Sequence, residues 1–313
     1  MRLPWPALAI CIGLVASSTG LAEVPKKLRL LIARSRVPQA LEMLGPLLDA
    51  SPDDPELHGV YGSLMTQAGW HGDAVTAFGF ADGSEWYAKN GMRQHANSLR
   101  AIGHVEEAVR VRELSRLNPR RDEASDVATF RELVNDYTEG RLWEEGELVV
   151  DELIGMSPEI PKSWATATWF HTARGDFDAA YWCAWQAERL GDPFESKVAR
   201  ANLYMEMGDL DAATVVLGDA LRRRARHLVA GAVKAELARR KGNPVEAIEI
   251  THHKRYNETT HIDLRSVEVR ALIDLHRFDE AADVLDVLGA QYERNPKYVD
   301  LAEELARAQA AAP

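Results

Sequence analysis

The chain has 313 residues, of which 46% are hydrophobic and 27% are charged, and this composition is typical of a folded soluble protein rather than a disordered one. Its formal net charge of −11 argues against a nucleic-acid binder, because phosphate contacts need a concentrated basic surface. The same charge disfavours broad attachment to an anionic membrane.

Residues 1–22 have the pattern of a secretory signal peptide. Arg2 supplies a positive end, residues 8–16 are apolar, and Ala22 closes a short small-residue segment that offers a cleavage site before Glu23. The apolar run is much shorter than the roughly 20 residues that span a bilayer, so an uncleaved anchor is the weaker alternative. Cys11 follows Ile10, whereas a lipoprotein signal needs a small residue before its cysteine. We therefore expect cleavage, no integral membrane segment afterwards, and a periplasmic or secreted protein.

A short pattern recurs along the rest of the chain, in which a glycine or polar residue is followed five positions later by alanine. Clear copies occupy residues 69–74, 103–108, 175–180, 208–213, 242–247 and 276–281. Weaker copies begin at Ser35 and at Gly140, where Glu145 stands in place of alanine. Glycine ends a helix readily because it adopts a left-handed backbone cheaply, and alanine lets two helices cross closely. The pattern therefore predicts a series of helix–turn–helix units.

The spacing of these copies resembles that of the tetratricopeptide repeat (TPR), a helix–turn–helix unit of about 34 residues. The resemblance covers nearly all of the chain after residue 22, and Tyr61, Ala74 and Phe78 match the family's other marks in the second repeat. It implies an all-α, right-handed superhelical solenoid of about seven to eight TPR-like repeats over residues 23–296. Residues 297–313 are expected to form a capping helix and tail that hide the open apolar face of the last repeat. Polar residues occupy the usual apolar slots of the last three repeats, so there either the register slips or the helices pack less deeply.

In this family the first helix of each repeat lines a concave groove, which is the usual place for a ligand. Counting the turn residue as position fifteen places cations and aromatic residues at the concave positions of the third to fifth repeats. The candidate partner contacts are Arg93, Asn97, Arg100, Arg131, Tyr137, Lys162 and Trp169. Such a groove suits an extended peptide with an acidic or carboxylate group. The alternative is that these are ordinary surface cations of exposed helices.

A narrower hypothesis comes from TPR proteins that clamp the C-terminal carboxylate of a peptide with five polar residues from three successive repeats. Asn97 and Lys162 are identical to the residues expected at their places, and Arg93 is chemically equivalent. Arg131 stands where asparagine is expected, and Thr166 stands where arginine is expected. The resemblance therefore implies a carboxylate clamp only in part.

Signals for chemistry are weak. His252 and His253 are adjacent, and neighbouring residues on a helix point about 100° apart, so they do not suit one metal ion together with His261. The sequence has no glycine-rich phosphate loop, serine elbow or Cys–His nucleophile pattern. Cys183 lies in an apolar helical setting and is expected to be buried.

We therefore expect an exported protein-binding scaffold or adaptor with no catalytic residue, cofactor or metal. Two alternatives remain open. One is a structural subunit of an envelope or secretion assembly that uses convex or edge surfaces, and the other is an enzyme or metal carrier built on the repeat frame.

Overall fold

The computed structural model describes residues 24–116, 123–191, 193–223, 227–253 and 261–312. The expected signal peptide, residues 1–22, lies outside them. Within the described residues no helix is both long and apolar enough to cross a membrane.

The regular structure of this part of the chain consists of helices, with one π-helical turn, η1 (Tyr87–Gly91), directly before α5. In chain order the α-helices are α1 (Lys26–Ala33), α2 (Val37–Ala50), α3 (Pro55–Ala68), α4 (His71–Phe80), α5 (Met92–Ala101), α6 (Val105–Arg116), α7 (Glu123–Glu139), α8 (Trp143–Met156), α9 (Pro161–Arg174), α10 (Phe177–Arg189), α11 (Phe194–Glu206), α12 (Leu210–Arg223), α13 (Leu228–Arg240), α14 (Pro244–Thr251), α15 (Ile262–Asp274), α16 (Phe278–Tyr292) and α17 (Pro296–Ala311).

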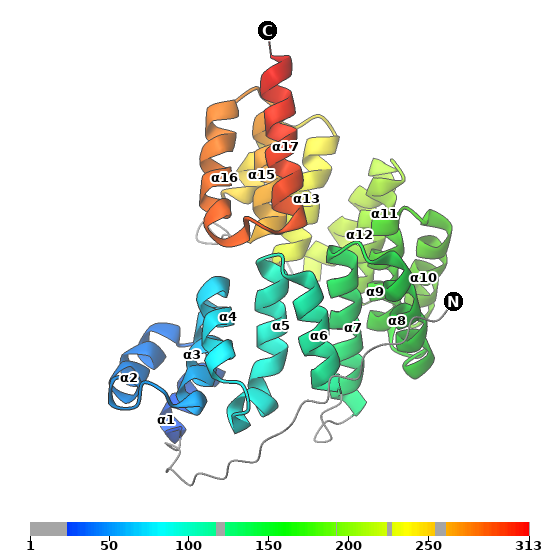
Figure 1. Ribbon diagram of the computed structural model, residues 1–313. Helices are drawn as coiled ribbons and strands as arrows, with labels where there is room; N and C mark the ends of the chain where they lie inside the picture. The colour runs from blue at the N-terminus through cyan, green and yellow to red at the C-terminus, as the bar shows by residue number, and fades with distance from the viewer. Residues whose placement is uncertain (1–23, 117–122, 192, 224–226, 254–260, 313) are drawn as a thin grey trace, which may run out of the picture.

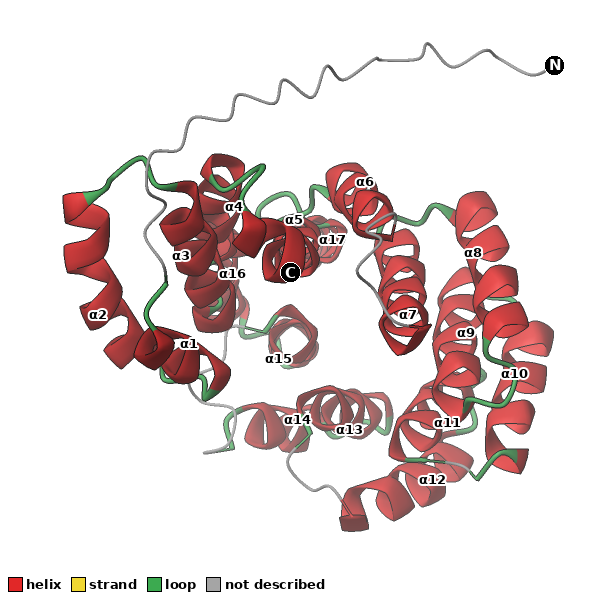
Figure 2. Cartoon of the chain, turned by 90° about the horizontal axis from the view of Figure 1, so that it is seen from below, coloured by secondary structure: helices red, strands yellow, loops and turns green. Residues whose placement is uncertain are grey.

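Consecutive helices pair as hairpins, from α1 with α2 to α15 with α16, and α17 follows the last pair. The first helix of one hairpin also contacts the first helix of the next, as α7 does with α9 and α9 with α11. The second helices α8, α10 and α12 lie outside them (Figure 2). The first helices therefore line the concave side, and the predicted all-α solenoid of TPR-like hairpins is confirmed.

The turn of each hairpin needs a left-handed residue. Gly69, Gly103, Gly175, Gly208 and Gly242 occupy this position with φ between 82° and 87°. In three hairpins a residue other than glycine takes the same conformation, and these are Ser35, Arg141 and His276. The turn positions predicted for the last three repeats are confirmed, so the register does not slip there.

The fourth repeat requires a correction. Its turn residue is Arg141 (φ 56°) rather than Gly140, and Gly146 rather than Glu145 occupies the alanine slot. Gly146 is buried, and a Cβ atom at this position would lie 2.5 Å from the ring of Phe170. The physical reason is that the Phe170 ring fills the space at the helix crossing, which leaves room for glycine alone.

The hydrophobic core is divided into clusters between neighbouring hairpins, as expected for a solenoid. The last cluster is closed by α17, whose Leu301 and Leu305 are buried against α15 and α16.

The superhelix turns far enough to bring its last repeat back onto the third and fourth repeats (Figures 1 and 2). The amide of Asn295, in the turn before α17, donates to the carbonyl of Ala101 over 3.3 Å. Lys297 pairs with Glu139 of α7 at 3.1 Å. We call this contact between the 292–300 segment and the ends of α5 and α7 the closure. It joins the last repeat to the third and fourth repeats.

Candidate partner-binding groove

The cations of α5 are held by a buried ionic network that the sequence reasoning missed. Arg112 of α6 is 1% exposed and is the largest fully buried side chain of the described residues. Its guanidinium pairs with Asp136 at 2.5 Å and with Glu132 at 2.5 Å, both on α7. Arginine is rarely fully buried, so no local pattern marks Arg112 as a core residue.

Three of the predicted groove residues join this network. Asn97 accepts a hydrogen bond from Arg112 over 2.8 Å, and Arg100 lies 3.5 Å from a carboxylate oxygen of Asp136. Arg93 pairs with Glu132 at 2.7 Å at the exposed end of the network. The structure thus brings these residues together with internal partners, and their first role is to join α5 to α6 and α7.

The other predicted contacts are distributed over the next two repeats. Lys162 pairs with Glu195 of α11 at 2.9 Å and is half-exposed. Trp169 is partly buried against the cluster of α11 to α13. Tyr137 is partly buried against α8 and α9, and burial raises its pKa. The register correction takes Tyr137 away from the positions that face the groove.

Arg131 differs from the other groove cations because it has no partner among the residues that the structure describes. The corrected register places Arg131 at the fifth position of its repeat, which is the position of Arg93 in the repeat before. Arg93 pairs with Glu132, the sixth residue of the next repeat. The equivalent residue opposite Arg131 is Thr166, whose hydroxyl donates to the carbonyl of Lys162 over 3.0 Å. We call each such pair, between position five of one repeat and position six of the next, a rung. A threonine cannot neutralise a guanidinium, so the rung of Arg131 and Thr166 has no carboxylate.

The atoms of Arg131 support this interpretation. Its Nε atom is buried and has no hydrogen-bond partner, and no ion pair of the described residues includes this side chain. On the neighbouring first helix, the buried Oε1 atom of Gln94 also lacks a partner. A buried polar group without a partner costs free energy, so each of these atoms is a place where a ligand or an ordered water can supply the missing partner. Arg131 can bind an anionic group, because its Nε donor has no partner among the described residues.

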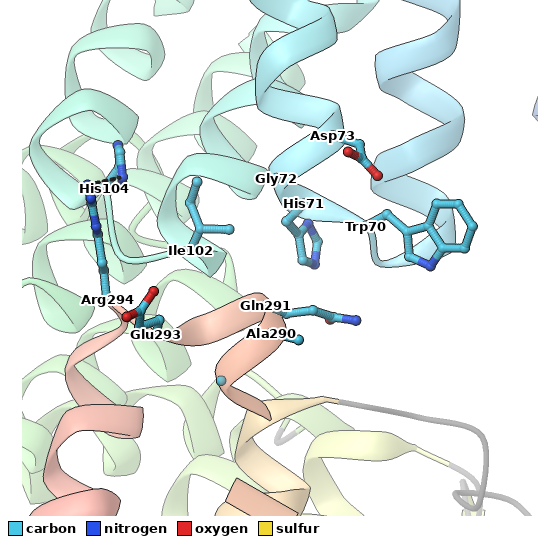
Figure 3. Close-up of a pocket in the computed structure, with 11 residues that line it drawn as sticks. Trp70, His71, Gly72, Asp73, Ile102, His104, Ala290, Gln291, Glu293 and Arg294 are labelled. Atoms are coloured by element: carbon cyan, nitrogen blue, oxygen red, sulfur yellow. Dashed lines mark hydrogen bonds between the residues drawn. The ribbon is translucent and has the colours of Figure 1, made fainter. Parts of the chain in front are cut away.

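A second concavity lies beside the closure, where the start of α4, the α5–α6 turn and the end of α16 meet (Figure 3). It has a volume of about 450 Å³ and is lined by Trp70, His71, Asp73, His104, Glu293, Arg294 and their neighbours. Burial lowers the pKa of His71 to about 4, and the nearby His261 and Arg100 act in the same direction. The lining mixes acids and bases, so it does not select one class of ligand.

The histidines weighed as metal ligands lie in ordinary polar contacts. His252 pairs with the buried Glu268, and His261, the residue before α15, lies 3.6 Å from a carboxylate oxygen of Asp263. No group of three or more metal-ligating side chains occurs within the described ranges.

No protein-family model matches the sequence, and no curated protein is detectably similar to it. Solved structures are similar in fold. Yeast Tom70 is 12% identical with a TM-score of 0.55 and is aligned over 92% of this chain and 61% of its own, so the chain spans about three fifths of the Tom70 chain. A tetratricopeptide repeat protein from Parabacteroides merdae is 12% identical with a TM-score of 0.52 over 85% of this chain and 99% of its own. Cut9 in the APC/C heterotetramer Cut9–Hcn1 is 14% identical with a TM-score of 0.50 over 88% and 57%. The chain therefore has the fold of a TPR solenoid.

Proposed function

We propose that this chain is an exported protein-binding scaffold whose concave groove holds an acidic segment of a partner protein. TPR-like folds generally mediate protein–protein interactions. The observation that supports a specific site is Arg131, a partly buried cation of the concave face that has no carboxylate partner within the described part of the chain. An acidic side chain or a C-terminal carboxylate of a bound peptide would complete the rung that Thr166 leaves open.

The net charge of the chain adds to this proposal. A strongly acidic protein repels most anions, so an anionic partner needs a local cation that is not already neutralised. Arg93, Arg100 and Lys162 each have a carboxylate of the same chain within 3.5 Å, and Arg131 has none among the described residues. The binding free energy should therefore depend more on Arg131 than on the other groove cations.

The experiment is crosslinking in the cells that produce the protein, followed by affinity capture and mass spectrometry. Wild type is compared with Arg131→Gln, which removes the charge, and with Thr166→Glu, which gives Arg131 an internal acid. Arg110→Gln is the matched control, because Arg110 is an exposed arginine of the second helix α6. We expect one partner to be captured by wild type and control and reduced about tenfold or more in both groove variants. Equal capture by all four proteins would show that the groove is not the site.

Binding assays with a synthetic peptide from the crosslinked region of the partner then identify which of its carboxylates pairs with Arg131. If amidation of a free C-terminus abolishes binding, the partner's carboxylate occupies the rung. If amidation has no effect and an internal Glu→Gln or Asp→Asn change abolishes binding, an acidic side chain does so, and the carboxylate-clamp hypothesis is wrong.

Export is a separate part of the proposal and rests on the pattern of residues 1–22. N-terminal sequencing of the protein from its own cells should show a chain that begins at Glu23. A chain that keeps residues 1–22 and remains with the cytoplasmic fraction would contradict export and leave the groove proposal untouched.

A further inference from the structure

The outer helix of the fifth repeat, α10, has an unusual distribution of side chains. Its buried face consists of small residues, namely Ala180, Cys183, Ala184 and Ala187. Its outward face carries large aromatic residues, namely Phe177 (36% exposed), Tyr181 (51%), Trp182 (51%) and Trp185 (44%). We call these four side chains the outer aromatic face. Successive residues of a helix are about 100° apart, so all four fall within a single arc of about 140°.

This face is not explained by packing within the chain. Trp182 makes an edge contact with the buried Trp164, at 5.1 Å between ring centroids, yet half of its surface remains exposed. Leu148, on the neighbouring outer helix α8, is also exposed at 70%. Helices α8 and α10 lie side by side on the outside of the superhelix (Figure 2). A contiguous group of exposed aromatic side chains on a folded protein usually marks an interaction site.

The charged residues of α8 and α10 indicate what kind of partner the outer aromatic face would bind. α8 contains five carboxylates and no basic residue in its sequence WEEGELVVDELIGM. Of these, Glu144, Glu145 and Asp151 are exposed and have no ion pair within the described residues, and the same is true of Asp178 on α10. The basic residue at the end of α10, Arg189, lies over the ring of Trp185 with its guanidinium carbon 4.6 Å from the centroid. One face of the Trp185 ring is therefore already paired with a cation of the same chain, and the unpaired carboxylates of α8 and Asp178 remain to attract a cationic partner.

We infer that the outer aromatic face docks a cationic amphipathic helix of a protein partner. Its apolar side would cover Tyr181, Trp182 and Trp185, and its lysine or arginine side chains would reach the carboxylates of α8 and Asp178. A second copy of the same face fits less well, because its carboxylates would meet like charges. An anionic membrane surface is disfavoured for the same reason. This face lies on the convex side, so the inference does not depend on the groove.

The probe is a labelled 16-residue helical peptide with leucine on one face and lysine on the other. The matched peptide has glutamate in place of every lysine. Anisotropy titrations are made with wild type, with Tyr181→Ser/Trp185→Ser, and with the control Val215→Ser, a 73% exposed residue of the outer helix α12. We expect the lysine peptide to bind wild type and the control alike, to bind the double variant at least tenfold more weakly, and to weaken as salt rises.

Three results would overturn the inference: no binding of the lysine peptide, equal binding of the glutamate peptide, or undiminished binding to the double variant. Sedimentation of the protein without peptide is a further test. If wild type forms a dimer and the double variant does not, a second copy of the chain occupies the face and the inference is wrong. Since the replaced side chains are exposed, circular dichroism should show an unchanged helix content. An Arg131→Gln variant should bind the lysine peptide normally, which separates this face from the groove.

Discussion

Gly103 lies directly against the backbone carbonyl of Arg294, so that a Cβ atom on Gly103 would approach the carbonyl oxygen to 2.2 Å. The neighbouring side chains of His104 and Arg294 are 3.2 Å apart although they are separated by 190 residues in the chain. This contact joins the third hairpin to the last one. A single added methyl group, in Gly103→Ala, is therefore enough to test whether the closure forms.

The change Gly103→Ala should destabilise the protein more than Gly69→Ala does. Both glycines have a left-handed backbone, with φ of 87° and 82°, so each substitution costs about 1–2 kcal/mol of local strain. Only Gly103 has backbone atoms of another hairpin against it, and nothing lies within 4 Å of the Cβ position of Gly69. Urea unfolding should therefore show a larger loss for Gly103→Ala, and small-angle scattering should show a larger radius of gyration. Equal losses with unchanged scattering would mean that the closure does not form in solution.

The corrected register of the fourth repeat can be checked by two Gly→Ala changes in one helix. Gly146→Ala should destabilise by about 1–3 kcal/mol, because its Cβ would overlap the ring of Phe170. Gly155→Ala meets nothing within 4 Å and should stabilise α8 by about 0.5–1 kcal/mol through helix propensity. Thermal unfolding of both variants is the measurement. If Gly146→Ala is as harmless as Gly155→Ala, then Gly146 does not occupy the alanine slot.

The buried network predicts a large effect for Arg112→Met. The substitution leaves the buried carboxylate of Asp136 without its main partner, and removing one member of a buried pair costs about 3–5 kcal/mol. The double variant Arg112→Met/Asp136→Leu should recover part of this loss, which a double-mutant cycle in urea would measure. Arg110→Met, an exposed change in the same helix, should alter stability by less than about 0.5 kcal/mol. A loss for Arg112→Met no larger than this control would contradict a buried ionic role.

The protein should lose stability in mild acid, in part because of His71. Burial holds the pKa of His71 at about 4 in the folded chain, below its ordinary value of 6.5. As the pH falls from 6.5 towards 4, the unfolded chain therefore takes up a proton that the folded chain does not, and the free energy of unfolding decreases. Below about pH 4 this histidine adds no further loss, and its total contribution is at most about 3 kcal/mol.

Urea unfolding at pH 7.5, 5.5 and 4 measures this dependence. His71→Gln should lose less stability over this range than wild type, and the exposed His276→Gln should follow wild type. Parallel curves for wild type and His71→Gln would show that His71 is protonated as easily in the folded chain as in the unfolded one. His71 is in ring contact with Tyr292, so a change in scattering at the same pH would locate the effect at the closure.

The repeat pattern predicted the hairpins, their approximate number and most of their turns, because these features depend on residues close together in the chain. A left-handed turn residue followed by a small residue at a helix crossing is a local requirement, and it recurs in every hairpin. The pattern failed at Gly140, where a glycine stands one position before the true turn residue, Arg141. The choice between them depends on Phe170 of the next hairpin, which demands Gly146 at the crossing.

The partners of the groove side chains were decided by the tertiary structure. Arg93 and Arg131 each face one residue on the first helix of the following repeat, and the identity of that residue decides whether the arginine forms an ion pair. A one-residue error in register assigns the wrong residue to this position. Arg112 became a core residue because Asp136 and Glu132 of α7 surround it, and its own neighbours in sequence give no sign of this. The closure depends on the twist that accumulates over several repeats, so it is a property of the whole superhelix rather than of any local segment.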